Sequence, residues 1–164
     1  MNKEFLVEQL RSQLEAAARA ALAAAEAVAL EAKEGATPDE KREDARAAHH
    51  ASAMGQAQDL RARRALGQSD GLLNFRPTAL PPTAAAGLGA IVEIEDTDTG
   101  EGRTFFLAPV GAGATLTGPG GDGYLSVVTP ASPVGRAVIG RRRGDTIDVT
   151  VDGESREWAI TMVA

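Results

Sequence analysis

Four carboxylates stand close together in the first half of the chain and form its densest group of residues able to do chemistry. They are Asp39, Glu40, Glu43 and Asp44, with two basic residues among them. Glu40 and Glu43 are three residues apart, which on a helix places them one turn apart on the same face. Carboxylate oxygens are the ligands that hard divalent cations prefer. The same residues suit the start of a helix, where the helix dipole favours negative charge, so both interpretations stay open.

A heptad pattern predicts a long helix before this cluster, from about residue 3 to about residue 33. Apolar residues recur there at alternating spacings of three and four, and no glycine or proline interrupts them. The positions are Val7, Leu10, Leu14, Ala17, Ala21, Ala24 and Val28. Because the row is large at one end and alanine in its middle, the helix buries little area alone and needs a partner.

The partner helix is predicted directly after a short break. Gly35 suits the end of the first helix, and Thr37 suits the start of the second with Glu40 as its capping-box partner. We expect the second helix from residue 38 to about residue 66, with this inward row: Ala47, Ala51, Met54, Ala57, Leu60 and Ala65. A short loop makes two such helices antiparallel neighbours. The carboxylates would then lie at the tip of a hairpin, at residues 34 to 44.

The second half of the chain has the shorter runs of a sheet. Residues 67 to 71 are helix breakers, and residues 76 to 89, rich in proline and alanine, are expected to be the least ordered part. Strands are expected near residues 91–94, 103–108, 124–128, 146–151 and 158–163, and a loop over the glycine-rich residues 111–123. The expected parts are a hairpin at 1–70, a linker at 71–89 and a small sheet domain at 90–164.

A short helix is predicted between the third and fourth of these strands. Ser132 can cap it, Pro133 suits its first turn, and Gly140 can end it. Val134, Ala137 and Val138 have the spacing of one buried face: on the residues alone, this is a packing helix that joins two strands.

The stretch from residue 132 to residue 145 resembles the S-P-x-G-R-A-x-x-G-x-x-x-G-D segment in the C-terminal domain of bacterial transcript cleavage factors, the GreA/GreB family. Residues 92 to 101 resemble the V-x-L-x-D-x-D-T-G-E hairpin of that family. The resemblance implies an α+β protein, in which an N-terminal antiparallel two-helix coiled-coil hairpin is followed by a small FKBP-like antiparallel sheet domain with one short helix.

The resemblance also implies a partner, RNA polymerase, and a docking region. Family members dock on the polymerase through the segment that here contains Ser132, Pro133, Gly135 and Arg136. The hairpin tip then enters the secondary channel of the enzyme. We therefore expect a transcription elongation factor that is not itself an enzyme.

In the family, two tip carboxylates spaced D-x-x-E help to hold the second catalytic magnesium, so that the polymerase cuts its own backtracked RNA. Glu40 and Glu43 have that spacing and are the expected catalytic and magnesium-binding pair, with Asp39 and Asp44 as secondary candidates. The pattern is not complete: Glu40 stands for Asp and Asp44 for Asn. Arg46 and the alanine after it replace a carboxylate and an aromatic residue.

The composition narrows the partners and the compartment. The chain of 164 residues has 17 Lys and Arg against 23 Asp and Glu, a net charge of −6. Such a chain gains little from counterion release, so we expect no binding to free DNA and only indirect contact with the 3′ end of the nascent RNA. It has no cysteine and no apparent signal peptide, which fits the cytoplasm. The apolar run at residues 16–30 contains Arg19 and Glu26, which argues against a membrane span. We expect a monomer with no cofactor of its own beyond a magnesium shared with the polymerase.

Three other functions fit the same sequence. A Gre-like regulator or inhibitor would keep the hairpin and lack cleavage activity. A peptidyl-prolyl isomerase would need an aromatic pocket, for which 4 Phe, 1 Tyr and 1 Trp are few. A structural coiled-coil adaptor would use the alanine-rich helices for association.

Overall fold

The computed structural model describes residues 3–34, 44–118, 123–151 and 153–164. The chain divides into two compact units. Ser12–Asp70 form the first, here called the helical unit, and Met1–Arg11 with Gly71–Ala164 form the second, here called the sheet unit. The residues up to Arg11 were expected to belong to the hairpin, and residues 71–89 were expected to form a linker. The structure groups both with the sheet.

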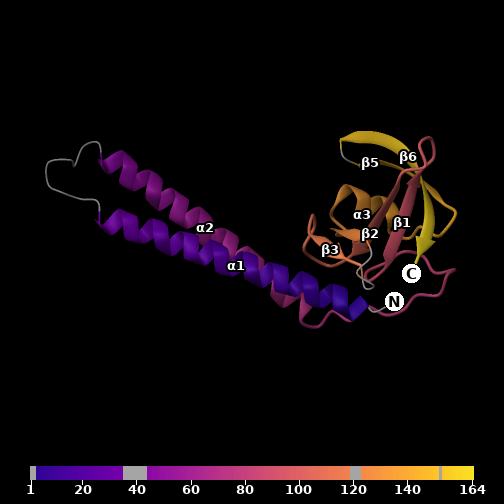
Figure 1. The fold of residues 1–164 in the computed structure, drawn as a ribbon, viewed down its shortest axis with the longest axis horizontal. Helices are drawn as coiled ribbons and strands as arrows, with labels where there is room; N and C mark the ends of the chain where they lie inside the picture. The colour runs from indigo at the N-terminus through magenta and orange to yellow at the C-terminus, as the bar shows by residue number, and fades with distance from the viewer. Residues whose placement is uncertain (1–2, 35–43, 119–122, 152) are drawn as a thin grey trace. The chain divides into compact units, whose positions relative to one another are not determined.

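The helical unit contains two long antiparallel helices (Figure 1). Helix α1 spans Lys3–Glu34 and helix α2 spans Asp44–Leu72. A Cβ atom at Gly55 of α2 would lie 3.9 Å from a methyl group of Val28 of α1, so the helices are in contact there. The expected two-helix hairpin is confirmed, while its tip, residues 35–43, lies outside the described residues.

Small residues form the centre of the helix contact. Ala18 of α1 and Ala62 of α2 are 1% and 0% exposed. On α1 the predicted row is correct at Leu14 and wrong at Ala17, which is exposed because Ala18 takes the inward position. Both positions are alanine, so residue type alone could not show which of the two is buried.

The inward row of α2 was predicted wrongly in its middle. Met54, Ala57 and Leu60 are exposed, although they are more apolar than the residues that replace them. The residues at inward positions, buried or half-buried, are Gly55, Gln58, Asp59, Ala62, Ala65 and Ser69. The inward positions carry small or polar residues, so hydrophobicity alone indicated the wrong face.

Helix α2 also continues past the residues expected to stop it. It includes Gly67 and Gly71 and ends at Leu72, whereas the sequence predicted an end near residue 66. A glycine in a helix costs about 1 kcal/mol relative to alanine. Ser69 and Leu72 are 6% and 1% exposed, and burying one leucine side chain contributes about 2 kcal/mol. Burial of the last turn therefore offsets the two glycines.

Six strands form one sheet in the sheet unit, in the order β3-β4-β2-β1-β6-β5. The strands are β1 Ile91–Asp96, β2 Gly102–Leu107, β3 Thr115–Thr117, β4 Tyr124–Val128, β5 Thr146–Val151 and β6 Glu154–Val163. Strands β2 and β4 pair in parallel, and the other pairs are antiparallel. The sheet is therefore mixed, where an antiparallel sheet was expected, because the long connection between β2 and β4 permits a crossover. That connection contains β3, within the segment expected to be a loop.

The core of the sheet unit lies between the sheet and helix α3, Pro133–Val138 (Figure 1). Val138 is 0% exposed and packs with side chains of β1, β2, β5 and β6. Ala86 and Ala90 belong to the same core, although residues 76–89 were expected to be the least ordered. Ala86 N donates to Arg141 O at 2.7 Å and its carbonyl accepts from Gly140 N at 2.8 Å. These two hydrogen bonds join residues 76–89 to the residues that follow α3.

The first turns of α1 belong to the sheet unit. Leu6 and Leu10 are 0% exposed. The Lys3 ammonium donates to Thr78 O at 2.8 Å, and burial lowers the pKa of Lys3. The Gln9 amide donates to Thr117 O at 3.0 Å and accepts from Thr117 N at 3.1 Å. Gln9 thus bonds to β3 as a neighbouring strand would.

Candidate functional site

The Ser132 hydroxyl is fully used within its own turn. It accepts from Gly135 N at 3.1 Å and from Thr129 N at 3.2 Å, and it donates to Thr129 O at 2.8 Å. Ser132 is therefore the N-cap of α3, as predicted, and Pro133 occupies the first turn. The role of Ser132 as the N-cap is enough to explain its presence, without any role in docking on a partner.

Gly135 has a second structural role, which the spacing did not reveal. A Cβ atom at this position would lie 1.9 Å from Thr129 O, far closer than any real contact. Gly135 is buried, so the start of α3 can pack against residue 129 only if position 135 has no side chain. Two of the four expected docking residues thus shape the helix.

The other two expected docking residues face outward. Pro133 and Arg136 are exposed, and Ile139, just after the helix, is 40% exposed. We call these three residues the α3 outer face. The Arg136 guanidinium donates to Ala131 O at 2.7 Å, which fixes the side chain beside the apolar pair. Ile139 was not predicted as a site residue, although its spacing of three from Arg136 indicated the same face.

The rest of the motif completes the turn into β5. Gly140 and Gly144 have φ of 78° and 94°, the left-handed region that glycine tolerates best. The Asp145 carboxylate accepts from Arg142 N at 2.8 Å. Each glycine and the aspartate of the motif therefore has a local structural cause.

The aspartate of the second motif organises the turn between β1 and β2. The Asp96 side chain is buried and accepts from Thr99 N at 2.9 Å, from Asp98 N at 2.8 Å and from Arg156 Nη1 at 3.0 Å. Chiefly the Thr99 amide, then the Arg156 guanidinium, lowers the pKa of Asp96 to about 2. Arg156 on β6 is a partner that the sequence did not identify, since it is distant in the chain.

The expected tip carboxylates are outside what the structure shows. Asp39, Glu40 and Glu43 lie outside the described residues, and Asp44 is the first residue of α2, with its side chain not described. Among the residues that are described, no three or more His, Asp or Glu side chains are grouped as a metal site. None of the described helices is both long and apolar enough to cross a membrane.

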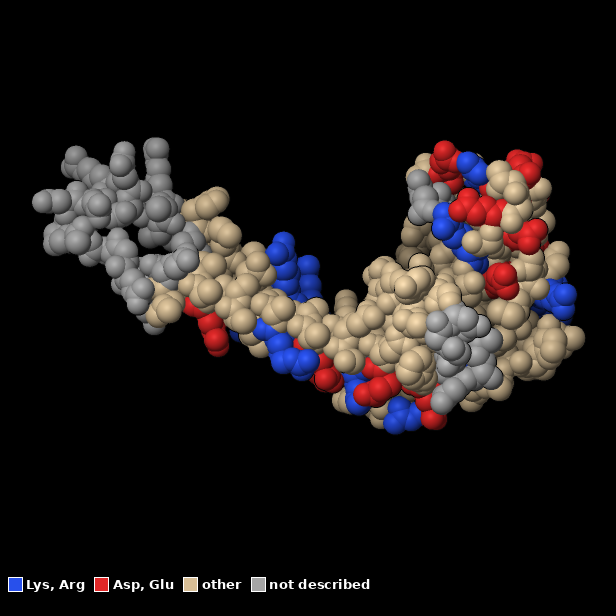
Figure 2. All heavy atoms as spheres, viewed as in Figure 1, with Lys and Arg blue, Asp and Glu red and all other residues tan. Residues whose placement is uncertain are grey.

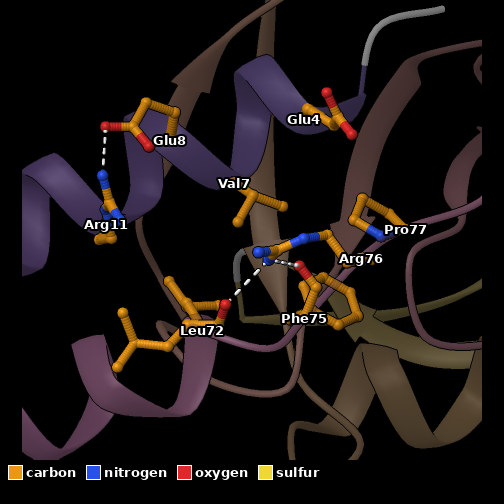
Figure 3. A pocket seen from close by; sticks show the side chains of 9 residues that line it. Glu4, Val7, Glu8, Arg11, Leu72, Phe75, Arg76 and Pro77 are labelled. Carbon is orange, nitrogen blue, oxygen red and sulfur yellow. Dashed lines mark hydrogen bonds and ion pairs between the residues drawn. The ribbon is translucent and has the colours of Figure 1, made fainter.

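One cavity of about 280 Å³ lies between the first turns of α1 and the segment after α2 (Figure 3). Its walls include Val7, Phe75 and Pro77, and its rim has the Glu8–Arg11 ion pair at 2.8 Å. Arg76 donates to Leu73 O and Phe75 O, at 2.9 and 3.1 Å. Glu8, Arg11 and Arg76 thus have partners within the wall.

The family model described as "Transcription elongation factor, GreA/GreB, C-term" matches residues 81–164, which are more than half of the chain. The chain belongs to the GreA/GreB family. The matched residues contain both motifs described above and all six strands of the sheet.

Individual relatives match over shorter stretches. The chain is 36% identical over 75 residues to transcription elongation factor GreA of Rhodospirillum rubrum, covering 46% of this chain and 43% of that protein. It is 29% identical over 77 residues to the transcription inhibitor protein Gfh1 of Thermus aquaticus, covering 47% and 45%. The matches thus span less than half the length of these relatives.

Solved structures of family members are similar over more of the chain. GreA factor homolog 1 (Gfh1) of Thermus thermophilus matches 96% of this chain and 94% of its own, at 20% identity and a TM-score of 0.42. A GreA/GreB factor from Nitrosomonas europaea matches 61% of this chain and 78% of its own, at 19% identity and a TM-score of 0.39.

Proposed function

We propose that this member of the GreA/GreB family docks on RNA polymerase through its sheet unit and enters the secondary channel with its hairpin tip. The α3 outer face supports this function, because Pro133, Arg136 and Ile139 remain exposed after Ser132 and Gly135 are used inside the turn. An apolar pair beside a fixed guanidinium fits a protein surface with apolar and acidic side chains. The factor would work where the polymerase does, in the cytoplasm.

At the tip, Glu40 and Glu43 would supply oxygens to a magnesium that the polymerase holds. A second metal at such a centre activates the attacking water, and the polymerase then cuts its backtracked RNA. The factor forms no bond itself and is an accessory to the enzyme.

A channel regulator without cleavage activity is the second candidate. One observation favours it: a relative at 29% identity is named a transcription inhibitor, and this chain has Glu40 and Asp44 where the cleavage pattern has Asp and Asn. Neither of the other two functions has a specific observation in its favour. For example, Trp158 is 3% exposed while Tyr124 is 77% exposed, so these two aromatic side chains do not share a pocket.

A polymerase pull-down tests the docking. We expect Ile139→Asp to reduce capture of purified RNA polymerase at least tenfold, because a carboxylate replaces the apolar contact. The matched control is Tyr124→Asp, at an exposed residue on β4. Equal capture by the wild type and Ile139→Asp would contradict docking through this face.

A stalled, backtracked transcription complex tests the chemistry. Glu40→Gln keeps a capping-box partner and loses the charge that a metal needs, so RNA cleavage should stop while binding persists. If the wild-type chain does not stimulate cleavage and instead competes with a cleavage factor for the polymerase, the regulator is the correct function.

A further inference from the structure

Strands β3 and β5 form the two edges of the sheet. Their outer backbone groups differ in whether another element bonds to them. On β3, the Gln9 amide bonds to both the N–H and the C=O of Thr117. On β5, within the described part of the chain, no hydrogen bond joins the outer edge to another element. Strand β5 therefore presents an uncovered edge that an extended chain could join.

The pairing of β5 with β6 shows which backbone groups face outward. Neighbouring residues on an antiparallel strand direct their N–H and C=O groups to opposite sides. Glu157, the partner of Asp148, directs its carbonyl to Thr97 N at 3.2 Å, on the β1 side. Asp148 therefore directs its backbone groups away from β6, and so do Thr146 and Thr150, two residues away on each side.

These three residues are exposed, while Ile147 and Val149 between them are 5% and 6% exposed in the core. An added strand would place alternate side chains on the two faces of the sheet, as β5 does. The side chains beside Asp148 would lie on the solvent face. Those beside Ile147 and Val149 would extend the apolar face.

The solvent face at this edge is acidic. Figure 2 shows Asp and Glu side chains near the β5–β6 end of the sheet unit, with Lys and Arg side chains among them. The acidic side chains on this face of β1, β5 and β6 are Glu95, Asp148 and Glu157. Glu154 lies on the opposite face, where it pairs with Arg156, and Glu101 pairs with Arg103. Asp148 and Glu157 are direct cross-strand partners, an arrangement of like charges that is unfavourable unless a cation lies nearby.

We propose that the outer edge of β5 binds an extended segment of a partner protein in which basic and apolar residues alternate. The edge supplies the backbone hydrogen bonds of strand addition, and Asp148 with Glu157 selects for lysine or arginine on the solvent face. A second copy of this chain fits poorly, because an antiparallel β5–β5 pair centred on Asp148 would bring two carboxylates together. The binding does not depend on the proposed polymerase function.

The probe is the blocked peptide acetyl-Lys-Val-Lys-Val-Lys-amide, titrated into the ¹⁵N-labelled full chain. We expect amide shifts at Thr146, Asp148 and Thr150, weakening with added salt. Two control peptides separate charge from backbone pairing. The first has Glu in place of each Lys, and the second keeps the Lys residues but carries N-methyl groups on their backbone nitrogens. Both should bind at least tenfold more weakly.

Two variants test the edge from the protein side. Asp148→Lys should weaken the peptide about tenfold or more, because it inverts a cross-strand charge pair, whereas Asp98→Lys in the β1–β2 turn should not. Thr150→Pro removes an outward N–H and spares the bonds to β6, so it should weaken binding while Thr150→Ala does not. Equal binding of the N-methylated peptide, no shifts at β5, or sedimentation showing a β5-dependent dimer would each overturn the proposal.

Discussion

Replacing Gly135 with alanine tests whether the motif around α3 specifies the fold. The new Cβ would lie 1.9 Å from Thr129 O, 2.7 Å from Thr129 C and 2.9 Å from Ser132 Oγ. Since real Cβ contacts under 3.0 Å essentially do not occur, the backbone would have to move by more than about 1 Å. Overpacking of this kind costs roughly 1–3 kcal/mol, and losing the helix cap adds about 1 kcal/mol. We therefore expect a loss of about 3 kcal/mol in the free energy of unfolding, or about a hundredfold in the folding equilibrium.

The single tryptophan makes this measurable. Trp158 lies on β6 and is 3% exposed, so its fluorescence in a urea titration reports the unfolding of the sheet unit. Ser132→Ala should lose about 1–2 kcal/mol through the cap alone, and the exposed Arg136→Ala should lose less than about 0.5 kcal/mol. If Gly135→Ala unfolds within about 0.5 kcal/mol of the wild type, the close approach to Thr129 is not a constraint and the reasoning fails.

Three further changes have expected outcomes. The pKa of Asp96 is lowered from 3.8 to about 2, so its contribution to stability is present above about pH 4 and is lost as the pH falls towards 2; Asp96→Asn should flatten this acid dependence in Trp158 fluorescence. Gln9→Ala removes two hydrogen bonds to β3 and should cost about 1–2 kcal/mol in the same urea assay. Ala62→Leu overpacks the helix contact and should cost roughly 1–3 kcal/mol, seen as earlier loss of helical circular dichroism, whereas Leu60→Ala at an exposed position should change little.

Local chemistry explains which parts of the fold could be predicted. The cap, first turn and end of α3 depend on Ser132, Pro133 and Gly140, whose preferences act within a few residues, and all three were predicted correctly. Strand alternation likewise placed most of the sheet. The end of α2 could not be predicted in this way, because the burial of Leu72 by distant residues offsets the effect of Gly67 and Gly71.

Tertiary contacts also determine two features that the sequence could not show, the inward face of α2 and the partner of Asp96. The inward row of α2 passes through Ala62, Ala65 and Ser69, while the more apolar Met54 and Leu60 face solvent. The buried state of Asp96 requires Arg156, sixty residues later. A pattern read along one element contains neither the distance to a neighbouring helix nor the identity of a cross-sheet partner.

The geometry of α3 changes what the S-P-x-G-R-A motif can be taken to mean. Ser132 and Gly135 are required by the turn itself, so their presence is evidence for the fold and is not evidence for docking. A protein could keep both residues and lose its partner. Evidence for docking must come from Pro133, Arg136 and Ile139, which the fold leaves exposed and does not need for packing of the core. Variants of Arg136 and Ile139 therefore separate partner binding from stability. Pro133 also sets the first turn of α3, and Ser132→Ala would lower stability and binding together, so neither of these two residues tests docking alone.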